Sequence, residues 1–325
     1  MALLEVRNLE VCFAMRHGTL TALRDVSFSV DKGERVGIVG ESGAGKSVAA
    51  FAILNLVAKP GYIAGGEILF EDTNLTKLTP QEMRSVRGNR ISMIFQDPMV
   101  TLNPVLTIGT QLTEALHAHR DIGNEEAKAI ALEKLAQVHI PSPAQRFDQY
   151  PHELSGGMRQ RVVIAIALLT NPSLIIADEP TTALDVTIQA EIMDLLLELC
   201  DTSNVGLILI THDLSVVAQI TQRAVVMYAG RVVEEGPTRK IIRDARHPYT
   251  RGLIGALPQQ TVPGRRLNQI KGIMPSLANI PTGCAFNPRC EYVMDACRTE
   301  VPNYSTQGDR RVACHMVAAQ DQRGS

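Results

Sequence analysis

Residues 40–47 have the composition and spacing of a loop that binds phosphate groups. They read Gly-Glu-Ser-Gly-Ala-Gly-Lys-Ser and match the pattern GxxxxGK followed by Ser or Thr. Glycines let backbone N–H groups approach phosphate oxygens where a side chain would block them. Lys46 would reach the β- and γ-phosphates of a nucleotide, and the Ser47 hydroxyl would bind Mg²⁺. The loop residues expected to contact nucleotide are Gly40, Ser42, Gly43, Ala44, Gly45, Lys46 and Ser47.

Two acidic residues could supply the chemistry of hydrolysis. Asp178 and Glu179 follow the apolar run 174–177, which is typical of a buried parallel strand whose carboxyl end opens at a ligand crevice. An acidic pair at such a position is usually just solvated, but downstream of a phosphate-binding loop it favours catalysis. We expect Asp178 in the outer shell of Mg²⁺ and Glu179 as the general base that polarises the attacking water.

Single polar residues end two further apolar runs, 91–95 and 205–211. Gln96 follows the first run and His212 follows the second. Gln96 offers a carbonyl oxygen to Mg²⁺ and an amide to the water, and His212 can donate a hydrogen bond to the γ-phosphate in the transition state. Each residue alone would more often be an ordinary polar strand end, but the order of these motifs along the chain argues against coincidence.

The segment 154–161 has the features of a glycine-rich helix start. Ser155 can cap a helix that continues through residues 160–168, and Gly156 and Gly157 leave its first turn bare. Exposed N–H groups and the positive end of the helix dipole would then face outward. An isolated helix end of this kind binds anions weakly, so it could form a second wall over the γ-phosphate of a nucleotide held by another subunit.

The elements that must position these residues alternate between strands and helices as far as residue 230. This alternation favours a parallel sheet covered on both faces. Between Gln96 and Leu154 the pattern becomes helical, over residues 111–116 and 125–132. A length of 325 residues allows one large domain and a smaller appendage, and 45% hydrophobic with 4% aromatic residues and no Trp suits an aliphatic core.

Charge and hydropathy limit the classes of partner. The net charge of −2 implies no strong attraction to nucleic acid. The sequence shows no basic-then-apolar segment typical of a signal peptide, and no apolar run approaches the ~20 residues needed to span a bilayer. We expect a soluble chain that docks on membrane partners if it belongs to a transporter.

These motifs, in this order, resemble those of the ATP-binding-cassette ATPases. The resemblance implies an α/β P-loop NTPase fold with a helical subdomain at about 97–170, which contacts a membrane subunit. It also implies that two ATP molecules are buried between two subunits arranged head to tail, with the 154–161 segment of each facing the nucleotide of the other. The residues so placed are Ser155, Gly156 and Gly157.

Two further sites follow from the same resemblance. The family usually stacks an aromatic ring from an early strand on adenine. Counting back without gaps from residues 26–28 indicates His17, and Phe13 is the alternative if the loop folds differently. Residues 180–185, directly after the acidic pair, resemble the loop of the family that contacts the dimer partner.

Four of the six cysteines lie near the C-terminal end of the chain. Their spacing is C-x5-C-x6-C-x16-C, and they are Cys284, Cys290, Cys297 and Cys314. Disulfides are disfavoured for a cytosolic ATPase, which meets reducing glutathione. Four thiolates can hold zinc or an iron–sulfur cluster, and the tight cysteine pairs usual at zinc sites are absent. We favour a 4Fe-4S cluster, with zinc and then free thiols as the alternatives.

The C-terminal part resembles the ATP-binding subunits of bacterial dipeptide and oligopeptide permeases, including nickel transporters. The motifs that carry this resemblance are His-Pro-Tyr-Thr at 247–250, Gly-Cys-Ala-Phe-Asn-Pro-Arg-Cys at 283–290, and Phe-Gln-Asp-Pro at 95–98. The match runs along essentially the whole chain and implies a nucleotide-binding domain at 1–255. Residues 256–325 would then form a small C-terminal extension that carries the 4Fe-4S cluster.

The resemblance also implies partners and a location. We expect a homologous second ATPase subunit, two transmembrane permease subunits and an extracytoplasmic substrate-binding protein, with this chain at the cytoplasmic face of the bacterial inner membrane. The ATPase sequence does not choose among peptides, nickel, glutathione and antimicrobial peptides as cargo.

Rival functions outside transport are disfavoured by the motif arrangement. A DNA-repair cassette would insert a long coiled coil between the phosphate loop and residue 154, and a translation factor would carry two cassettes. A non-hydrolysing structural module would be expected to lack Glu179 or His212, and both are present.

Overall fold

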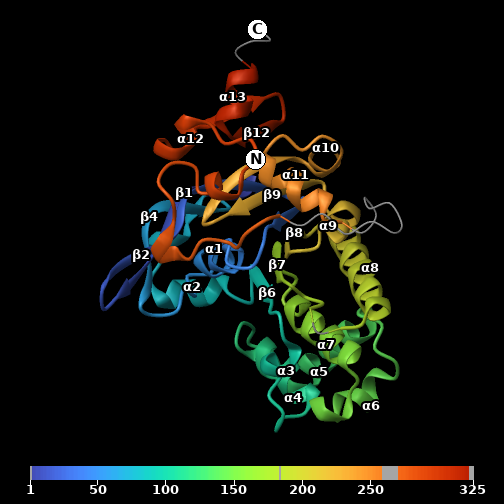
Figure 1. The fold of residues 1–325 in the computed structure, drawn as a ribbon. Coiled ribbons are helices and arrows are strands. Elements are labelled where there is room, and N and C mark those ends of the chain that lie inside the picture. The colour runs from blue at the N-terminus through green and yellow to red at the C-terminus, as the bar shows by residue number, and fades with distance from the viewer. Residues whose placement is uncertain (1, 183, 258–269, 322–325) are drawn as a thin grey trace. The chain divides into compact units, whose positions relative to one another are not determined.

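The computed structural model describes residues 2–182, 184–257 and 270–321. The chain divides into two compact units (Figure 1). Unit 1 holds residues 31–34 and 77–208, and unit 2 holds residues 2–30, 35–76 and the chain from 209 onward. The units interleave along the sequence because the chain leaves unit 2 after residue 76 and returns to it at residue 209.

Unit 2 contains an antiparallel sheet built on a long hairpin. Strands β1 (Ala2–Met15) and β2 (Gly18–Asp31) are joined by a two-residue turn, and β4 (Gly61–Phe70) and β5 (Thr73–Asn74) complete the order β2-β1-β4-β5. Such a short turn can join only antiparallel strands, so this part departs from the predicted parallel sheet.

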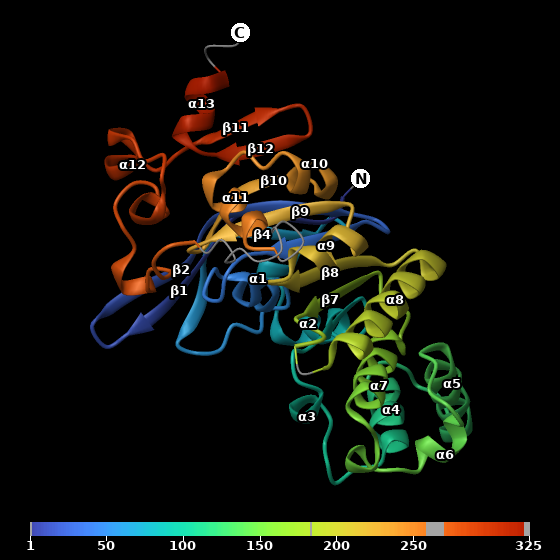
Figure 2. The ribbon, with the colours of Figure 1, turned by 45° about the vertical axis from the view of Figure 1, so that its right-hand side comes forward.

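A second, mixed sheet of unit 2 carries the phosphate loop. β3 (Arg35–Val39) pairs in parallel with β9 (Arg223–Tyr228), and β9 pairs in antiparallel fashion with β10 (Arg231–Pro237). β12 (Arg310–Ala313) then pairs with β10, and β11 (Tyr304–Gln307) pairs with β12 (Figure 2). The order is β11-β12-β10-β9-β3, continued by β8 (Gly206–Thr211). The C-terminal extension therefore adds two strands to this sheet.

A buried ion pair fastens β12 to β10. Nη2 of Arg310 lies 2.8 Å from Oε1 of Glu234, and the side chains are 6% and 0% exposed. The Glu234 carboxylate also accepts the backbone N–H groups of Arg246 and His247 at 2.9 and 3.0 Å. These four charged or polar groups compensate one another, as buried charges require.

The helices of unit 2 are mostly short. They are α1 (Lys46–Ile53), α9 (Leu214–Ile220), α10 (Thr238–Arg243), α11 (Pro248–Gly255), α12 (Asp295–Thr299) and α13 (His315–Asp321). α1 begins directly after the phosphate loop, and its small apolar residues Ala49, Ala50 and Ala52 are buried.

Unit 1 is mainly helical. β6 (Ile91–Ile94) and β7 (Leu174–Asp178) pair in parallel, and β8 continues the order β8-β7-β6. Between β6 and β7 the elements are all helices, which confirms the helical pattern predicted there. The main helices of this unit are α2 (Pro80–Val86), α3 (Pro98–Thr101), α4 (Ile108–His117), α5 (Asn124–Gln137), α6 (Pro143–Phe147), α7 (Gly156–Leu168) and α8 (Val186–Ser203).

The helices α4, α5 and α7 pack against one another and lie side by side in Figures 1 and 2. Fully buried Leu112, Leu116, Ala131 and Leu135 contribute to their core. None of the helices in the described residues is both long and apolar enough to cross a lipid bilayer.

Candidate nucleotide site

The phosphate loop joins buried strand β3 to helix α1 in unit 2. Gly45 precedes the helix with a φ of 100°, a conformation that glycine adopts readily. A Cβ at this position would lie 2.8 Å from Cδ2 of Leu23, so a larger residue would collide with β2. The helix N-terminus receives no side-chain cap from Gly45, as expected where a phosphate is to be bound.

Lys46 lies over the loop to which it belongs. Its ammonium donates to the carbonyl oxygens of Gly40 at 2.9 Å and Glu41 at 3.2 Å, and the residue is 6% exposed. These bonds hold the positive charge of Lys46 at the loop. The arrangement suits a site for an anion that carries several negative charges.

Glu41, the second residue of the loop, is held by two residues far along the chain. Both of its carboxylate oxygens accept from Arg289, at 2.6 and 3.0 Å, and its backbone N–H donates to the Tyr249 hydroxyl at 2.8 Å. The Arg289 side chain is 5% exposed, and the bond to Glu41 raises the pKa of its guanidinium. This bidentate pair ties the C-terminal extension to the phosphate loop.

The Arg289–Glu41 pair was not predicted from the sequence. Arg289 and Tyr249 belong to the motifs 283–290 and 247–250, which indicated a family resemblance but no contact. Because 248 residues separate Glu41 from Arg289, no local pattern could have paired them. The only signal was the presence of an arginine and a tyrosine within these two motifs.

Tyr249 is positioned by the residue that caps helix α11. The backbone N–H of Tyr249 donates to Nδ1 of His247 at 3.1 Å. Burial, together with the positive charge of Arg251, lowers the pKa of His247 to about 3. The imidazole is therefore neutral near pH 7 and can accept this bond.

In unit 1 the structure brings Gln96 and Glu179 together. The Gln96 amide donates to Oε2 of Glu179 at 3.2 Å, and the Thr182 hydroxyl donates to the same oxygen at 2.9 Å. Asp178 ends the fully buried strand β7 and is 5% exposed. Glu179 has a φ of 45°, an uncommon conformation for a residue with a side chain, and such strain is often found at functional sites.

The glycine-rich helix start forms as predicted. The Ser155 hydroxyl caps helix α7 by accepting from the N–H of Met158 at 3.3 Å. Ser155 and Gly156 are exposed. A Cβ at Gly157 would lie 2.8 Å from Cγ2 of Ile188, so glycine is needed there for packing against α8 as well as for a bare first turn.

The remaining predicted residues lie at the ends of strands in unit 2. His212 is exposed directly after β8, and His17 is exposed in the turn between β1 and β2. Phe13 is half-buried in β1 opposite Gly61.

Loop residues 180–182 and 184–185 are described, whereas Ala183 of the predicted dimer-contacting loop lies outside the described residues. The proposed Mg²⁺ ligand Ser47 belongs to unit 2, and Gln96 belongs to unit 1.

The four C-terminal cysteines lie close enough to influence one another's ionisation. Burial, with a smaller contribution from the thiols of Cys297, Cys314 and Cys290, raises the pKa of Cys284 to about 11. The N–H of Cys284 also donates to the carbonyl of Cys297 at 2.9 Å. Within the described residues, however, no group of three or more His, Cys, Asp or Glu side chains is arranged to hold a metal ion.

Comparison with known proteins identifies the family. The model of the ABC transporter family matches residues 23–182, and that of the oligopeptide/dipeptide transporter C-terminal region matches residues 233–297. The dipeptide transport ATP-binding protein DppD of Escherichia coli is 47% identical over 97% of both chains. This chain belongs to the ABC-transporter ATP-binding proteins. A second relative is the oligopeptide transport ATP-binding protein OppD of Bacillus subtilis, which is 52% identical. The alignment covers 90% of this chain and 82% of the OppD chain.

Solved structures agree with the assignment as an ABC ATPase. The ATP-binding cassette MJ0796, in a dimeric post-hydrolysis state bound to ADP and Pi, matches with a TM-score of 0.65 and 30% identity. The match covers 73% of this ABC chain and 99% of that cassette. The predicted P-loop NTPase fold and ATPase activity are thus confirmed, while the roles assigned to individual residues remain predictions.

Removal of the Arg289 guanidinium should lower both the stability of this protein and its affinity for ATP, because Arg289 holds Glu41 of the phosphate loop. We expect Arg289→Gln to lower the free energy of unfolding by about 3 kcal/mol and to raise the KM for ATP, because the Glu41 carboxylate loses its bidentate partner. Urea unfolding and steady-state ATPase assays measure the two effects. A matched control is Lys271→Gln, because Lys271 pairs with Glu291 at 3.9 Å with both side chains at least 74% exposed. Equal stability and equal KM for ATP in the two variants would contradict the role given to the Arg289–Glu41 pair.

Proposed function

We propose that this chain is the ATP-hydrolysing subunit of an importer that takes up dipeptides or oligopeptides. The observation that carries the proposal is the match of residues 233–297 to the oligopeptide/dipeptide transporter C-terminal region, beyond the part common to ABC cassettes. The relatives named for dipeptide and oligopeptide transport are 47% and 52% identical along most of the chain. Nickel, glutathione and antimicrobial peptides are the alternative cargoes for the same ATPase role.

The proposed mechanism assigns each residue a task in ATP hydrolysis. The loop 40–47 binds the phosphates, and Lys46 and His212 stabilise negative charge that develops on the γ-phosphate. Ser47 and Gln96 are the residues that would hold Mg²⁺, with Asp178 in its outer shell. When bound, Mg²⁺ neutralises charge on the phosphate oxygens.

We assign to Glu179 the role of polarising the attacking water. The Gln96 amide and the Thr182 hydroxyl both donate to its Oε2, and these two bonds fix the orientation of the carboxylate. Deprotonation of the water would let its oxygen attack the γ-phosphorus, with ADP as the leaving group.

The glycine-rich helix start would act on a second subunit. Ser155 and Gly156 are exposed at the N-terminal end of α7, where backbone N–H groups and the helix dipole attract anions. In a head-to-tail dimer this end would cover the γ-phosphate bound by the partner ATPase, so that ATP joins the subunits and hydrolysis releases them. The dimeric state of the MJ0796 cassette supports this arrangement.

The proposed transporter contains further subunits. We propose a homologous second ATPase, two transmembrane permease subunits and an extracytoplasmic substrate-binding protein, with this chain bound at the cytoplasmic face of the inner membrane. The helical region at about 97–170 would contact the permease and move with hydrolysis. We retain 1–255 as the nucleotide-binding domain and 256–325 as the extension.

The cargo can be tested by uptake. Disruption of the gene should abolish ATP-dependent uptake of a labelled dipeptide, and the intact gene should restore it while the Glu179→Gln variant should not. Uptake of nickel and of glutathione, measured in parallel, separates the alternative cargoes. Normal dipeptide uptake in the disrupted strain with impaired nickel uptake would replace the peptide assignment.

We also propose that the four C-terminal cysteines hold a 4Fe-4S cluster, with zinc as the runner-up. The donor set fits, because four thiols lie within electrostatic reach of one another and burial of Cys297 and Cys314 shields them from solvent. The side chains do not form a complete metal-holding group as they stand. They would therefore have to converge when the cluster binds. No step of ATP hydrolysis is assigned to it.

Metal analysis of protein purified without oxygen tests this site. We expect about four irons per chain with matching sulfide and an absorption band near ~400 nm, as for Cys-ligated clusters. Cys290→Ser should lose the band, whereas Cys200→Ser should keep it, because Cys200 is buried in helix α8. Stoichiometric zinc without iron would indicate a structural metal site, and metal-free protein would contradict both assignments.

A further inference from the structure

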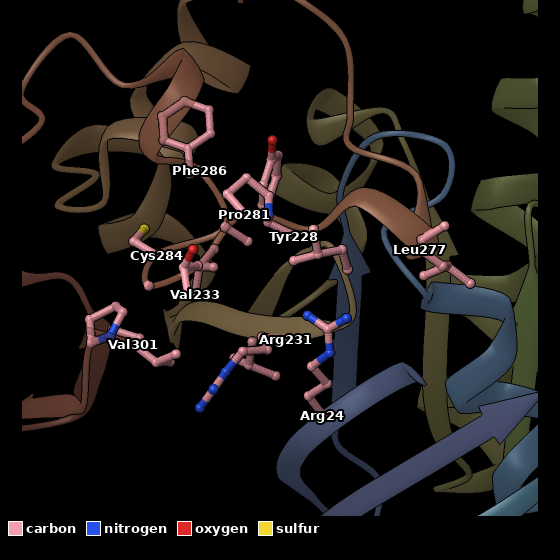
Figure 3. Close-up of a pocket in the computed structure, with 17 residues that line it drawn as sticks. Arg24, Tyr228, Arg231, Val233, Leu277, Pro281, Cys284, Phe286 and Val301 are labelled. Carbon is pink, nitrogen blue, oxygen red and sulfur yellow. The ribbon is translucent and has the colours of Figure 1, made fainter. Parts of the chain in front are cut away.

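Unit 2 contains a cavity of about 420 Å³ that the nucleotide site does not use. Its walls come from β2, from the ends of β9 and β10, and from the segment 277–286 of the C-terminal extension (Figure 3). A cavity of this volume can enclose a small organic molecule. Of the four C-terminal cysteines, Cys284 alone is among the residues that line it, so the cavity adjoins the proposed metal site at Cys284 but does not contain the other three proposed ligands.

The walls of the cavity are mainly apolar on one side and cationic on the other. Figure 3 shows Phe286 and Pro281 across the cavity from Arg24 and Arg231. The apolar rings and the aliphatic side chains of Val233, Leu277 and Ile280 offer surface to a hydrocarbon or aromatic body. The two guanidinium groups come from different strands and lie at the same cavity.

Arg24 is the cation available to a ligand. Arg231 already pairs with Asp25 at 3.2 Å. Arg24 makes a long bond to the carbonyl of Thr21, at 3.4 Å, and the carboxylate of Glu10 acts on it electrostatically, without an ion pair among those of the described residues. Burial and the positive charge of Arg231 lower its pKa, so an anion placed here would relieve an unfavourable interaction between like charges.

We propose that this cavity binds a small organic anion with an apolar body, whose carboxylate or sulfonate accepts hydrogen bonds from Arg24. The body lies against Phe286 and Pro281. A guanidinium recognises such a planar or multi-oxygen anion through parallel N–H donors. Neutral apolar molecules fit the walls but form no charge-assisted hydrogen bond with Arg24, and free phosphate binds Arg24 but leaves the apolar walls uncovered.

An occupant would contact the residues that hold the phosphate loop. Tyr228 and Phe286 line the cavity, and the guanidinium of Arg289 lies 5.8 and 5.9 Å from their ring centroids. Arg289 in turn binds Glu41 of the loop. We therefore infer that the anion is an effector that changes ATP affinity, a role that does not depend on which cargo is transported.

A second path links the cavity to the same loop. The backbone N–H of Arg24 donates to the carbonyl of Gly230 at 2.8 Å, and the N–H of Gly230 donates to the carbonyl of Ala44 at 2.9 Å. Ala44 belongs to the phosphate loop. Two hydrogen bonds thus connect β2 at Arg24 to the phosphate loop, and a displacement of β2 there would act on the loop through them.

Two dyes that differ in charge test the proposal on the purified full-length chain. The anionic dye 8-anilinonaphthalene-1-sulfonate is the probe, and N-phenyl-1-naphthylamine has the same rings without the sulfonate. We expect Arg24→Gln to weaken binding of the anionic dye about 10-fold, the loss of one charge-assisted hydrogen bond, with binding of the neutral dye unchanged. Arg16→Gln, an exposed arginine in the same hairpin, is the matched control and should leave both dyes unaffected.

A second variant and an ATPase measurement distinguish dye binding in this cavity from dye binding at other sites. Ala278 is exposed and lines the cavity, so Ala278→Phe should block both dyes without disturbing the core. Saturating anionic dye should shift the KM for ATP of the wild type by about twofold or more and leave that of Ala278→Phe unchanged. Equal dye affinities of Arg24→Gln and Arg16→Gln, retained binding in Ala278→Phe, or simple competition between ATP and dye would each overturn the proposal.

Discussion

Glu179→Gln is expected to lower ATP turnover by about 10²- to 10⁴-fold, the range that a general base contributes, while ATP binding persists. Glutamine keeps the size of the side chain and can still accept from Gln96 and Thr182, which donate to Oε2 of Glu179 at 3.2 and 2.9 Å. It cannot take a proton from water. Because hydrolysis would release the ATP-bound dimer, the variant should accumulate in a closed dimeric state.

Phosphate release and size-exclusion chromatography with ATP and Mg²⁺ measure these two effects. Glu191→Gln is the matched control, because Glu191 lies in the same unit, is 51% exposed and pairs with Arg161 at 3.0 Å. A surface pair of this kind contributes little, so turnover should stay near the wild-type rate. Wild-type turnover in Glu179→Gln would exclude this residue as the general base. Other polar residues of unit 1 would then be the candidates for that role.

Lys46→Ala is expected to reduce the affinity for ATP by about 100-fold or more, since two charge-assisted hydrogen bonds to phosphate oxygens are lost. Lys46 is 6% exposed, and its ammonium donates to the loop carbonyls of Gly40 and Glu41. No other cation of the segment 40–47 could replace it.

Titration with a fluorescent ATP analogue measures the change in affinity. Lys32→Ala, an exposed lysine that precedes strand β3, should bind the analogue like the wild type. Circular dichroism of both variants separates a binding defect from unfolding. Micromolar affinity retained in a folded Lys46→Ala protein would contradict the role given to this lysine.

The cassette motifs were predictable because each depends on backbone geometry over a few residues. Gly45 and Ser155 stand at the starts of helices α1 and α7, where a bare glycine and a capping hydroxyl have local reasons to occur. The proximity of Gln96 and Glu179 was also within reach, since both follow neighbouring parallel strands whose carboxyl ends meet at one edge of a sheet.

The sequence by itself determined the phosphate loop, the acidic pair, the capped glycine-rich helix and the family to which they point. Only the tertiary structure decided that Arg289 binds Glu41, that β11 and β12 extend the sheet of β3, and that Arg24 faces an apolar cavity. These contacts join residues separated by up to about 250 positions, and their partners are selected by packing rather than by local propensity. A motif reflects the local backbone geometry of a few neighbouring residues. A long-range ion pair forms only when packing of the core places its two residues next to each other.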